Sequence, residues 1–141
     1  MKIREFMTKN VVTCTPETTC LEAAKEMKTH DIGSLPVVKN NKLTGLITDR
    51  DIVLRCIAVA QDPKLTSVAS CMSTTPVTCG PDTDAHEAAR LMAAEQIRRL
   101  PVVENGTLVG MVALGDLAVI DVHINEAGDA LSSISEQTHI H

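Results

Sequence analysis

The second half of the chain repeats the first half at an offset of 65 residues. Between Met7 and Val53 the match needs no gap, and 19 of 47 positions carry the same residue in both copies. The first copy carries Val-Thr-Cys-Thr-Pro at Val12–Pro16 and Leu-Pro-Val-Val at Leu35–Val38, and both runs return in the second copy with one change. A repeat of this kind indicates two copies of one supersecondary unit that share a backbone.

The 141 residues suffice for one domain, or for two very small domains that share a core. With 44% hydrophobic and 22% charged residues, the composition is that of a soluble globular protein. No apolar run is long enough to span a bilayer, and the N-terminus lacks a signal peptide's apolar stretch, so we predict no membrane association. Five scattered cysteines without a CxxC pair fit a reducing compartment, and we expect a cytoplasmic location.

Charge and aromatic content exclude nucleic acid as an expected partner. The net charge is −5, whereas a nucleic-acid surface needs clustered basic residues. Phe6 is the only aromatic residue, so the stacking platforms of single-strand binders are missing. A flat ligand would have to lie between aliphatic side chains and backbone.

Each copy is expected to begin with a strand and a helix. Short β-prone runs at 11–13 and 77–78 end before a proline, which predicts the first strand. Thr19-x-x-Glu22 and Asp84-x-x-Glu87 then have the spacing of a capping box, which predicts a helix start in each copy.

A hairpin and a second helix are expected next. Apolar runs flank Lys39–Lys42 in the first copy and Glu104–Gly106 in the second, and Asn-Gly between such runs is a strong hairpin signal. A second helix is predicted to start near Asp51 and near Asp116. Its expected apolar face in the first copy consists of Ile52, Val53, Cys56 and Val59.

The predicted fold is therefore α/β in composition, of the α+β class, with two tandem β-α-β-β-α units. One such unit cannot bury its sheet face alone, so we expect the two units to pack sheet to sheet about a pseudo-two-fold axis, with a ligand cleft where they meet. The expected boundaries are 1–60 for the first unit, 61–67 for a linker, 68–121 for the second unit and 122–141 for a C-terminal tail.

The run Gly45–Asp51, read as Gly-Leu-Ile-Thr-Asp-Arg-Asp, adds a family signature of the form G-h-h-T/S-x-x-D, where h is hydrophobic. Together with the duplication and the Leu-Pro-Val-Val runs, it resembles a tandem pair of cystathionine-β-synthase (CBS) domains, or Bateman module, over about residues 1–120. The chain is most similar to the small stand-alone bacterial modules. The resemblance implies a regulatory protein without catalytic activity or a required cofactor, which binds an adenine nucleotide, forms a homodimer and signals to a separate, unidentified protein.

The resemblance also implies which residues surround the ligand. The signature aspartates Asp51 and Asp116 would bind the ribose hydroxyls, and Thr48 would lie near the first phosphate. The remaining expected ligand-binding positions follow the first strand, precede or enter the second strand, or supply positive charge: Thr13, Cys14, Thr78, Cys79, Gly33, Ser34, Pro36, Pro101, Arg50, Arg98 and Arg99.

Several of these residues have a purely structural interpretation. Thr48 and Asp51 also have capping-box spacing, and Cys14 and Cys79 are typical small core residues. Arg98 and Arg99 are either solvated or a bidentate phosphate clamp, and the sequence leaves open which cleft they serve. Because Ala113 stands where the first copy has Thr48, the two clefts are expected to differ in affinity.

Three functions remain in competition. The first is an adenine-nucleotide sensor of the AMP, ADP and ATP class. The second is a sensor of a cyclic dinucleotide or of S-adenosylmethionine, and the third is a structural or interaction module without ligand. Neither a nucleophile–base pair nor a metal cluster is evident, so an enzyme is not expected, and no metal site is predicted.

Overall fold

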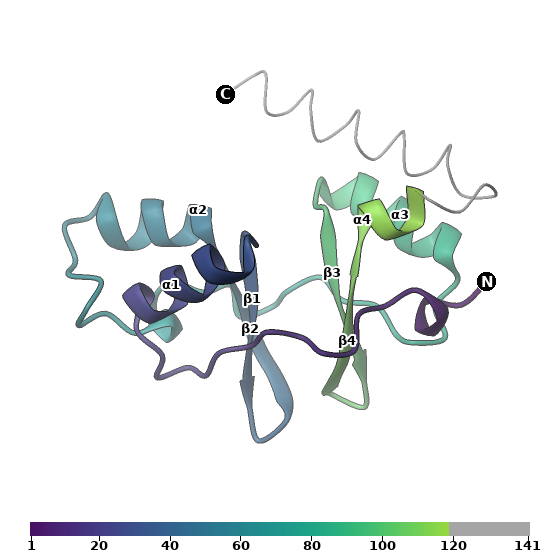
Figure 1. Cartoon of the computed structure of the whole chain (residues 1–141), viewed down its shortest axis with the longest axis horizontal. Helices are drawn as coiled ribbons and strands as arrows, with labels where there is room; N and C mark the ends of the chain where they lie inside the picture. The colour runs from purple at the N-terminus through teal and green to yellow at the C-terminus, as the bar shows by residue number, and fades with distance from the viewer. Residues whose placement is uncertain (119–141) are drawn as a thin grey trace. The chain divides into compact units, whose positions relative to one another are not determined.

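The computed structural model describes residues 1–118 and divides the chain into two compact units (Figure 1). The first-repeat unit consists of Val12–Pro76, a single continuous segment. The second-repeat unit combines Met1–Val11 with the chain from Val77 onward. The compact units therefore divide the chain differently from the repeat, because the N-terminal residues belong to the unit that carries the second copy.

The elements of the two units correspond at the same offset of 65 residues. In the first-repeat unit, helix α1 (Cys20–His30) precedes strands β1 (Ser34–Lys39) and β2 (Lys42–Thr48), which pair antiparallel. In the second-repeat unit, helix α3 (Ala85–Glu95) precedes strands β3 (Arg99–Glu104) and β4 (Thr107–Ala113), which also pair antiparallel. Both hairpins carry a register irregularity at equivalent positions, so the duplication extends to backbone detail and the predicted α+β class is confirmed.

Short helices complete each unit. Helix α2 (Asp49–Ile52) follows β2 and continues directly into a π-helix, Val53–Ile57. Helix α4 (Leu114–Ala118) follows β4, at the end of the described residues. Two 3-10 turns, Ile3–Glu5 and Val68–Ser70, also correspond at the repeat offset. None of the helices within residues 1–118 is long and apolar enough to cross a membrane.

The turn of each hairpin confirms the prediction from the sequence. Asn40 and Asn41 have φ of 52° and 65°, and Asn105 and Gly106 have φ of 53° and 80°. Two consecutive left-handed residues match the right-handed twist of the flanking strands, and asparagine and glycine tolerate that conformation better than other residues.

The predicted first strands are reduced to single bridging residues. Cys14 forms an isolated parallel bridge with Val37, and Cys79 forms the equivalent bridge with Val102. The prediction of a longer strand at 11–13 and 77–78 is therefore wrong. The proline two residues after each bridge, Pro16 in the first copy, has no backbone N–H to extend the pairing.

The capping prediction is right for α1 and wrong in part for α3. Thr19 and Glu22 exchange side-chain hydrogen bonds with each other's backbone N–H groups at 3.1 and 3.2 Å. Asp84 instead accepts a hydrogen bond from the backbone N–H of His86, and Glu87 pairs with Arg90. Asp84 therefore caps α3 without the reciprocal bond.

The predicted apolar face of the second helix in the first copy is half wrong. Ile52 and Cys56 are buried, but Val53 and Val59 are 54% and 56% exposed. The prediction assumed a regular period of 3.6 residues up to Val59, whereas the π-helix has a wider turn that shifts Val59, which follows it, from the expected face. Val53 stands at the start of that turn, and one step from Ile52 already places it about 100° around the helix.

A short segment binds back onto each hairpin at its central glycine. In the first-repeat unit Ser73 bridges antiparallel to Leu46, and in the second-repeat unit Thr8 bridges to Met111. The approach is close, because a Cβ added at Gly45 would lie 2.6 Å from the backbone oxygen of Ser73. Met7-Thr8 and Met72-Ser73, which begin the two copies, therefore belong to the β-structure of the hairpins that they contact.

Each unit has its own hydrophobic core. In the first-repeat unit buried residues of α1, β1 and β2 pack with Val68, and the cluster includes four cysteines, Cys14, Cys20, Cys56 and Cys71. In the second-repeat unit the buried residues of α3, β3, β4 and α4 pack with Ile3. All five cysteines are free and buried.

Candidate ligand-binding site

The start of α2 presents the signature residues of the first copy. The Thr48 hydroxyl accepts a hydrogen bond from the Asp51 backbone N–H, and the Asp51 carboxylate accepts one from the Thr48 N–H, both at 3.0 Å. The structural interpretation of this pair as a capping box is therefore confirmed. Only Oδ2 of Asp51 is used for the cap, and the side chain remains 17% exposed, so Oδ1 stays available for further contacts.

Arg55 is the charged neighbour of that second oxygen. Its Nε lies 3.9 Å from Oδ1 of Asp51, and its Nη1 donates a hydrogen bond of 3.2 Å to the carbonyl oxygen of Cys71. Sequence analysis missed Arg55, although its position four residues after Asp51 on a predicted helix was an available signal for an ion pair.

The residues before β1 lie beside the capping box. Ser34 pairs with Thr48 in the hairpin register, and the Gly33 carbonyl accepts a hydrogen bond of 2.9 Å from the Asp49 N–H. A Cβ at Gly33 would lie 3.1 Å from the Asp49 carboxylate, so glycine keeps this corner open. The structure thus brings Gly33 and Ser34 together with Thr48, and their role in ligand binding stays a prediction.

The second copy has a similar corner with different chemistry. The Asp116 carboxylate accepts a hydrogen bond of 3.1 Å from the Ala113 N–H, but Ala113 has no hydroxyl that could accept a hydrogen bond from the Asp116 N–H. Arg99 pairs with Ala113 in the hairpin, and the Arg98 carbonyl accepts a hydrogen bond of 2.8 Å from the Leu114 N–H. Both arginines are exposed and lie next to the Asp116 corner of their own unit.

The cysteine and proline positions of the predicted site contribute backbone rather than side chain. Cys14 N–H donates to the Pro36 carbonyl at 3.0 Å, and Cys79 N–H donates to the Pro101 carbonyl at 3.1 Å. All four side chains are buried. Burial raises the pKa of the Cys14 and Cys79 thiols to about 11, so both are protonated at neutral pH and are poor nucleophiles or metal ligands.

The neighbouring threonines and Arg50 are more accessible. Thr13 and Thr78, each next to a buried cysteine, are exposed, and so is Arg50 at the start of α2. A ligand role for these three side chains stays a prediction. Within residues 1–118 no group of three or more His, Cys, Asp or Glu side chains is placed to hold a metal ion.

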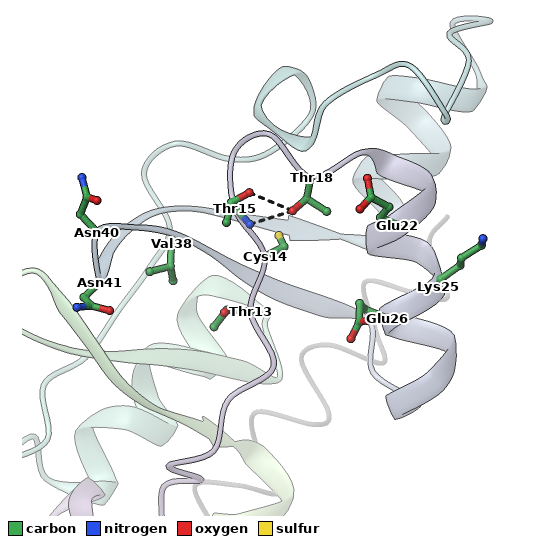
Figure 2. A pocket seen from close by; sticks show the side chains of 10 residues that line it. All are labelled: Thr13, Cys14, Thr15, Thr18, Glu22, Lys25, Glu26, Val38, Asn40 and Asn41. Carbon is green, nitrogen blue, oxygen red and sulfur yellow. Dashed lines mark hydrogen bonds between the residues drawn. The ribbon is translucent and has the colours of Figure 1, made fainter.

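A separate cavity of about 610 Å³ lies within the first-repeat unit (Figure 2). It is open at the surface between the loop that precedes α1, one face of α1 and the hairpin turn. Of the predicted ligand residues it contains only Thr13 and Cys14, and not Ser34, Thr48 or Asp51. The lining residues are Thr13, Cys14, Thr15, Thr18, Glu22, Lys25, Glu26, Val38, Asn40 and Asn41.

The comparisons with known proteins agree on one family. The CBS domain model matches residues 3–57 and again residues 68–122. The CBS domain-containing protein YhcV of Bacillus subtilis is 47% identical over 135 residues, which cover 96% of either chain.

Two solved structures show the same fold. A conserved CBS domain protein of unknown function from Thermoplasma acidophilum has a TM-score of 0.82 at 27% identity, covering 94% of this chain and 75% of that one. The hexameric CBS-CP12 protein from bloom-forming cyanobacteria has a TM-score of 0.74 at 32% identity, covering 88% of this chain and 70% of that one. Both the sequence signature and the architecture are thereby accounted for, and the chain belongs to the CBS domain family as a tandem pair of CBS domains.

Proposed function

We propose that this chain is a regulatory module without catalytic activity, which binds an adenosyl ligand of the AMP, ADP and ATP class and signals to a separate protein. CBS domain pairs are generally regulatory and ligand-binding, and stand-alone members are generally not catalytic. The observation that carries the proposal is the Asp51 corner. There a partly exposed carboxylate with one uncommitted oxygen lies beside Thr48 and beside the open backbone at Gly33.

The chemistry of that corner suits a ribose. A carboxylate oxygen can accept hydrogen bonds from two vicinal hydroxyls, and hydrogen bonds to charged groups are among the stronger ones. Arg50 places positive charge beside the same corner, which favours an anionic phosphate. We also propose that an adenosyl ligand contacts Asp116, Arg98 and Arg99 in the second copy.

The absence of Trp and Tyr from the sequence makes the first experiment simple. The purified chain absorbs almost nothing at 280 nm, so a peak at 260 nm reports bound nucleotide, which mass spectrometry then identifies. Thermal shift with AMP, ADP and ATP should raise the melting temperature at ligand concentrations above Kd. S-adenosylmethionine and a cyclic dinucleotide test the alternative ligands.

A matched pair of variants links binding to the site. Asp51→Asn should lower affinity at least about tenfold, because it removes the charge that strengthens the ribose contact. Asp62→Asn, an exposed aspartate of the same unit, should bind like the unaltered chain. If no adenosyl compound shifts the melting temperature at millimolar concentration, the sensor proposal is wrong.

A second candidate, an interaction module that assembles with copies of itself, is favoured by a different observation. Val53, Leu54, Ile57 and Val59 are all large apolar residues about half exposed on or just after the π-helix. Such a cluster on a soluble surface is typical of a protein interface, and the related CBS-CP12 protein is hexameric. Light scattering tests it: if the chain is a homodimer through this cluster, Ile57→Asp should give a monomer, and an unchanged mass would exclude this surface.

A further inference from the structure

Arg55 connects two segments that lie far apart in the sequence. Its guanidinium reaches Oδ1 of Asp51 with Nε and the carbonyl oxygen of Cys71 with Nη1, at 3.9 and 3.2 Å. The contact with Cys71 is reciprocal, because the Cys71 thiol donates to the Arg55 carbonyl at 3.5 Å. Arg55 therefore contacts Cys71 through both its backbone and its side chain, and its half-exposed guanidinium lies beside the carboxylate.

The two oxygens of Asp51 consequently have different neighbours. Oδ2 accepts the Thr48 N–H at 3.0 Å, and Oδ1 faces the Arg55 guanidinium. The hydrogen bond to Oδ2 and the ion pair beside Oδ1 favour one orientation of the carboxylate, while Oδ1, which accepts no hydrogen bond from Arg55 at this distance, stays available to a ligand. Preorganisation of this kind lowers the entropic cost of binding.

The second copy has no cation at the position equivalent to Arg55. The Asp116 carboxylate accepts the Ala113 N–H at 3.1 Å, which is the equivalent of the Oδ2 contact. The residue 65 positions after Arg55 is Ile120, which lies outside the described residues but carries no charge in any conformation. An ion pair between the signature aspartate and an arginine four residues later is thus specific to the first copy, whereas the carboxylate and its backbone contact are common to both.

We propose that Arg55 is a positioning residue that holds the Asp51 carboxylate in the orientation that accepts the vicinal hydroxyls of a ribose. This inference rests on the proposed adenosyl function and deepens it, because it makes the Asp51 corner the tighter of the two for a physical reason. Arg55 acts through Asp51 and not on the ligand's phosphate. The rival interpretation, direct contact between Arg55 and a phosphate, becomes one outcome of the test.

The choice of ligands separates the two interpretations. Adenosine has both hydroxyls and no phosphate, AMP has both hydroxyls and a phosphate, and 2′,3′-dideoxyadenosine has neither hydroxyl. A positioning role predicts that Arg55→Gln weakens adenosine and AMP by the same factor, about two- to fivefold for a half-exposed ion pair, and leaves dideoxyadenosine unchanged. Direct phosphate contact predicts a loss for AMP alone.

Calorimetric titration of four forms of the full-length chain completes the test: unaltered, Arg55→Gln, Asp51→Asn and the double variant. Arg55→Gln should cost nothing further in the Asp51→Asn background, because its effect passes through the carboxylate. Arg90→Gln, which removes an arginine from an exposed ion pair of the other unit, is the matched control and should bind normally. Circular dichroism at the titration temperature confirms that each variant is folded.

The outcomes distinguish this inference from the function on which it rests. If the unaltered chain binds adenosine or AMP but Arg55→Gln has no effect, affects AMP alone, or adds its loss to that of Asp51→Asn, the positioning role is overturned and the adenosyl function stands. If the unaltered chain binds neither adenosine nor AMP, and ADP and ATP also fail to raise its melting temperature, the proposed function is wrong and the inference is overturned with it.

Discussion

The two units carry the same elements at the same offset, yet they fill equivalent core positions with different side chains. In the first-repeat unit Cys20 and Cys71 are buried in contact, with their Sγ atoms 3.9 Å apart. The equivalent residues of the second-repeat unit are Ala85, which is buried, and Phe6, which packs against the same core cluster. Two medium side chains are thus replaced by a small and a large one. The second pair is larger in total, and Phe6 is only partly buried, so the shared backbone does not depend on one choice of side chains at these positions.

The candidate site differs in another way. The hairpin register and the backbone N–H to aspartate bond are common to both units. The Thr48 hydroxyl and the Arg55 guanidinium occur in the first copy alone, and the Arg98–Arg99 pair occurs in the second alone. The scaffold is therefore duplicated, whereas the groups that would recognise a ligand are divided between the copies.

The largest expected effect tests whether the N-terminal residues Met1–Val11 belong to the second-repeat unit. Ile3 is fully buried in the core of the second-repeat unit, so Ile3→Ala should reduce the free energy of unfolding by about 2–4 kcal/mol. Amide hydrogen exchange should accelerate in α3, β3 and β4 and remain slow in α1 and β1. The equivalent Val68→Ala should do the reverse, with a smaller loss because fewer methyl groups are removed. Faster exchange in α1 after Ile3→Ala would contradict the unit boundaries.

The next effect concerns the two central glycines of the hairpins. A Cβ at Gly45 would meet the backbone oxygen of Ser73 at 2.6 Å, whereas at Gly110 the nearest backbone atom is 3.0 Å away and the closest atom belongs to the flexible Met7 side chain. Gly45→Ala should therefore cost about 2–3 kcal/mol of unfolding free energy and Gly110→Ala about 1 kcal/mol. Denaturant unfolding followed by circular dichroism measures both.

Gly115→Ala is the control for this pair, because nothing lies within 4 Å of the added Cβ and the residue is in helix α4. It should be neutral or slightly stabilising. Equal losses at Gly45 and Gly110 would show that the Ser73 backbone moves away from an added Cβ as easily as the Met7 side chain does.

The sequence was most informative where structure is decided locally. Asn40-Asn41 and Asn105-Gly106 tolerate positive φ, and Thr19 with Glu22 satisfies the first N–H groups of a helix, so both hairpins and α1 could be predicted. The signature also located the Thr48–Asp51 corner, because its residues lie within one turn of chain and their spacing survives in the fold.

The sequence was least informative where distant parts of the chain decide the outcome. The π-helix at Val53–Ile57 shifts Val59 from the predicted face, and no periodicity in the sequence reveals it. The assignment of Ile3 to the second copy's core depends on residues about 80 positions away. Arg55 was missed for the same reason, because its second partner, the Cys71 carbonyl, carries no side-chain signal in the sequence.

Binding should distinguish the two aspartates. Asp51→Ala should weaken adenosyl-ligand affinity at least about tenfold, whereas Asp116→Ala should weaken it about two- to threefold, because Asp116 lacks both the returning hydroxyl and the guanidinium. Calorimetric titration measures both. Equal losses of affinity would mean that the differences between the two corners do not affect the ligand. The prediction that the two sites differ in affinity would then be wrong.

The smallest effect depends on pH and is confined to the second-repeat unit. Arg4 donates to the Asp82 carboxylate from Nε at 2.9 Å and from Nη2 at 2.7 Å. The equivalent residues of the first-repeat unit are Ala69 and Glu17, so no such pair exists there. The Arg4 hydrogen bond is the main reason that the pKa of Asp82 is lowered in the folded chain, and Lys2 adds to the effect.

Because the folded pKa of Asp82 is below its unfolded value, the pair stabilises the fold at neutral pH, and this contribution is lost as the pH falls through the folded pKa. Arg4→Ala should therefore lower Tm slightly at pH 7, and the difference from the unaltered chain should shrink as the pH drops below the ordinary aspartate pKa. Ala69→Ser, a change at the equivalent position of the other unit, should show no such trend. A difference in Tm that stays constant down to pH 2 would assign the effect of Arg4 to packing of its aliphatic stem, and the two units would then differ at this position in shape and not in charge.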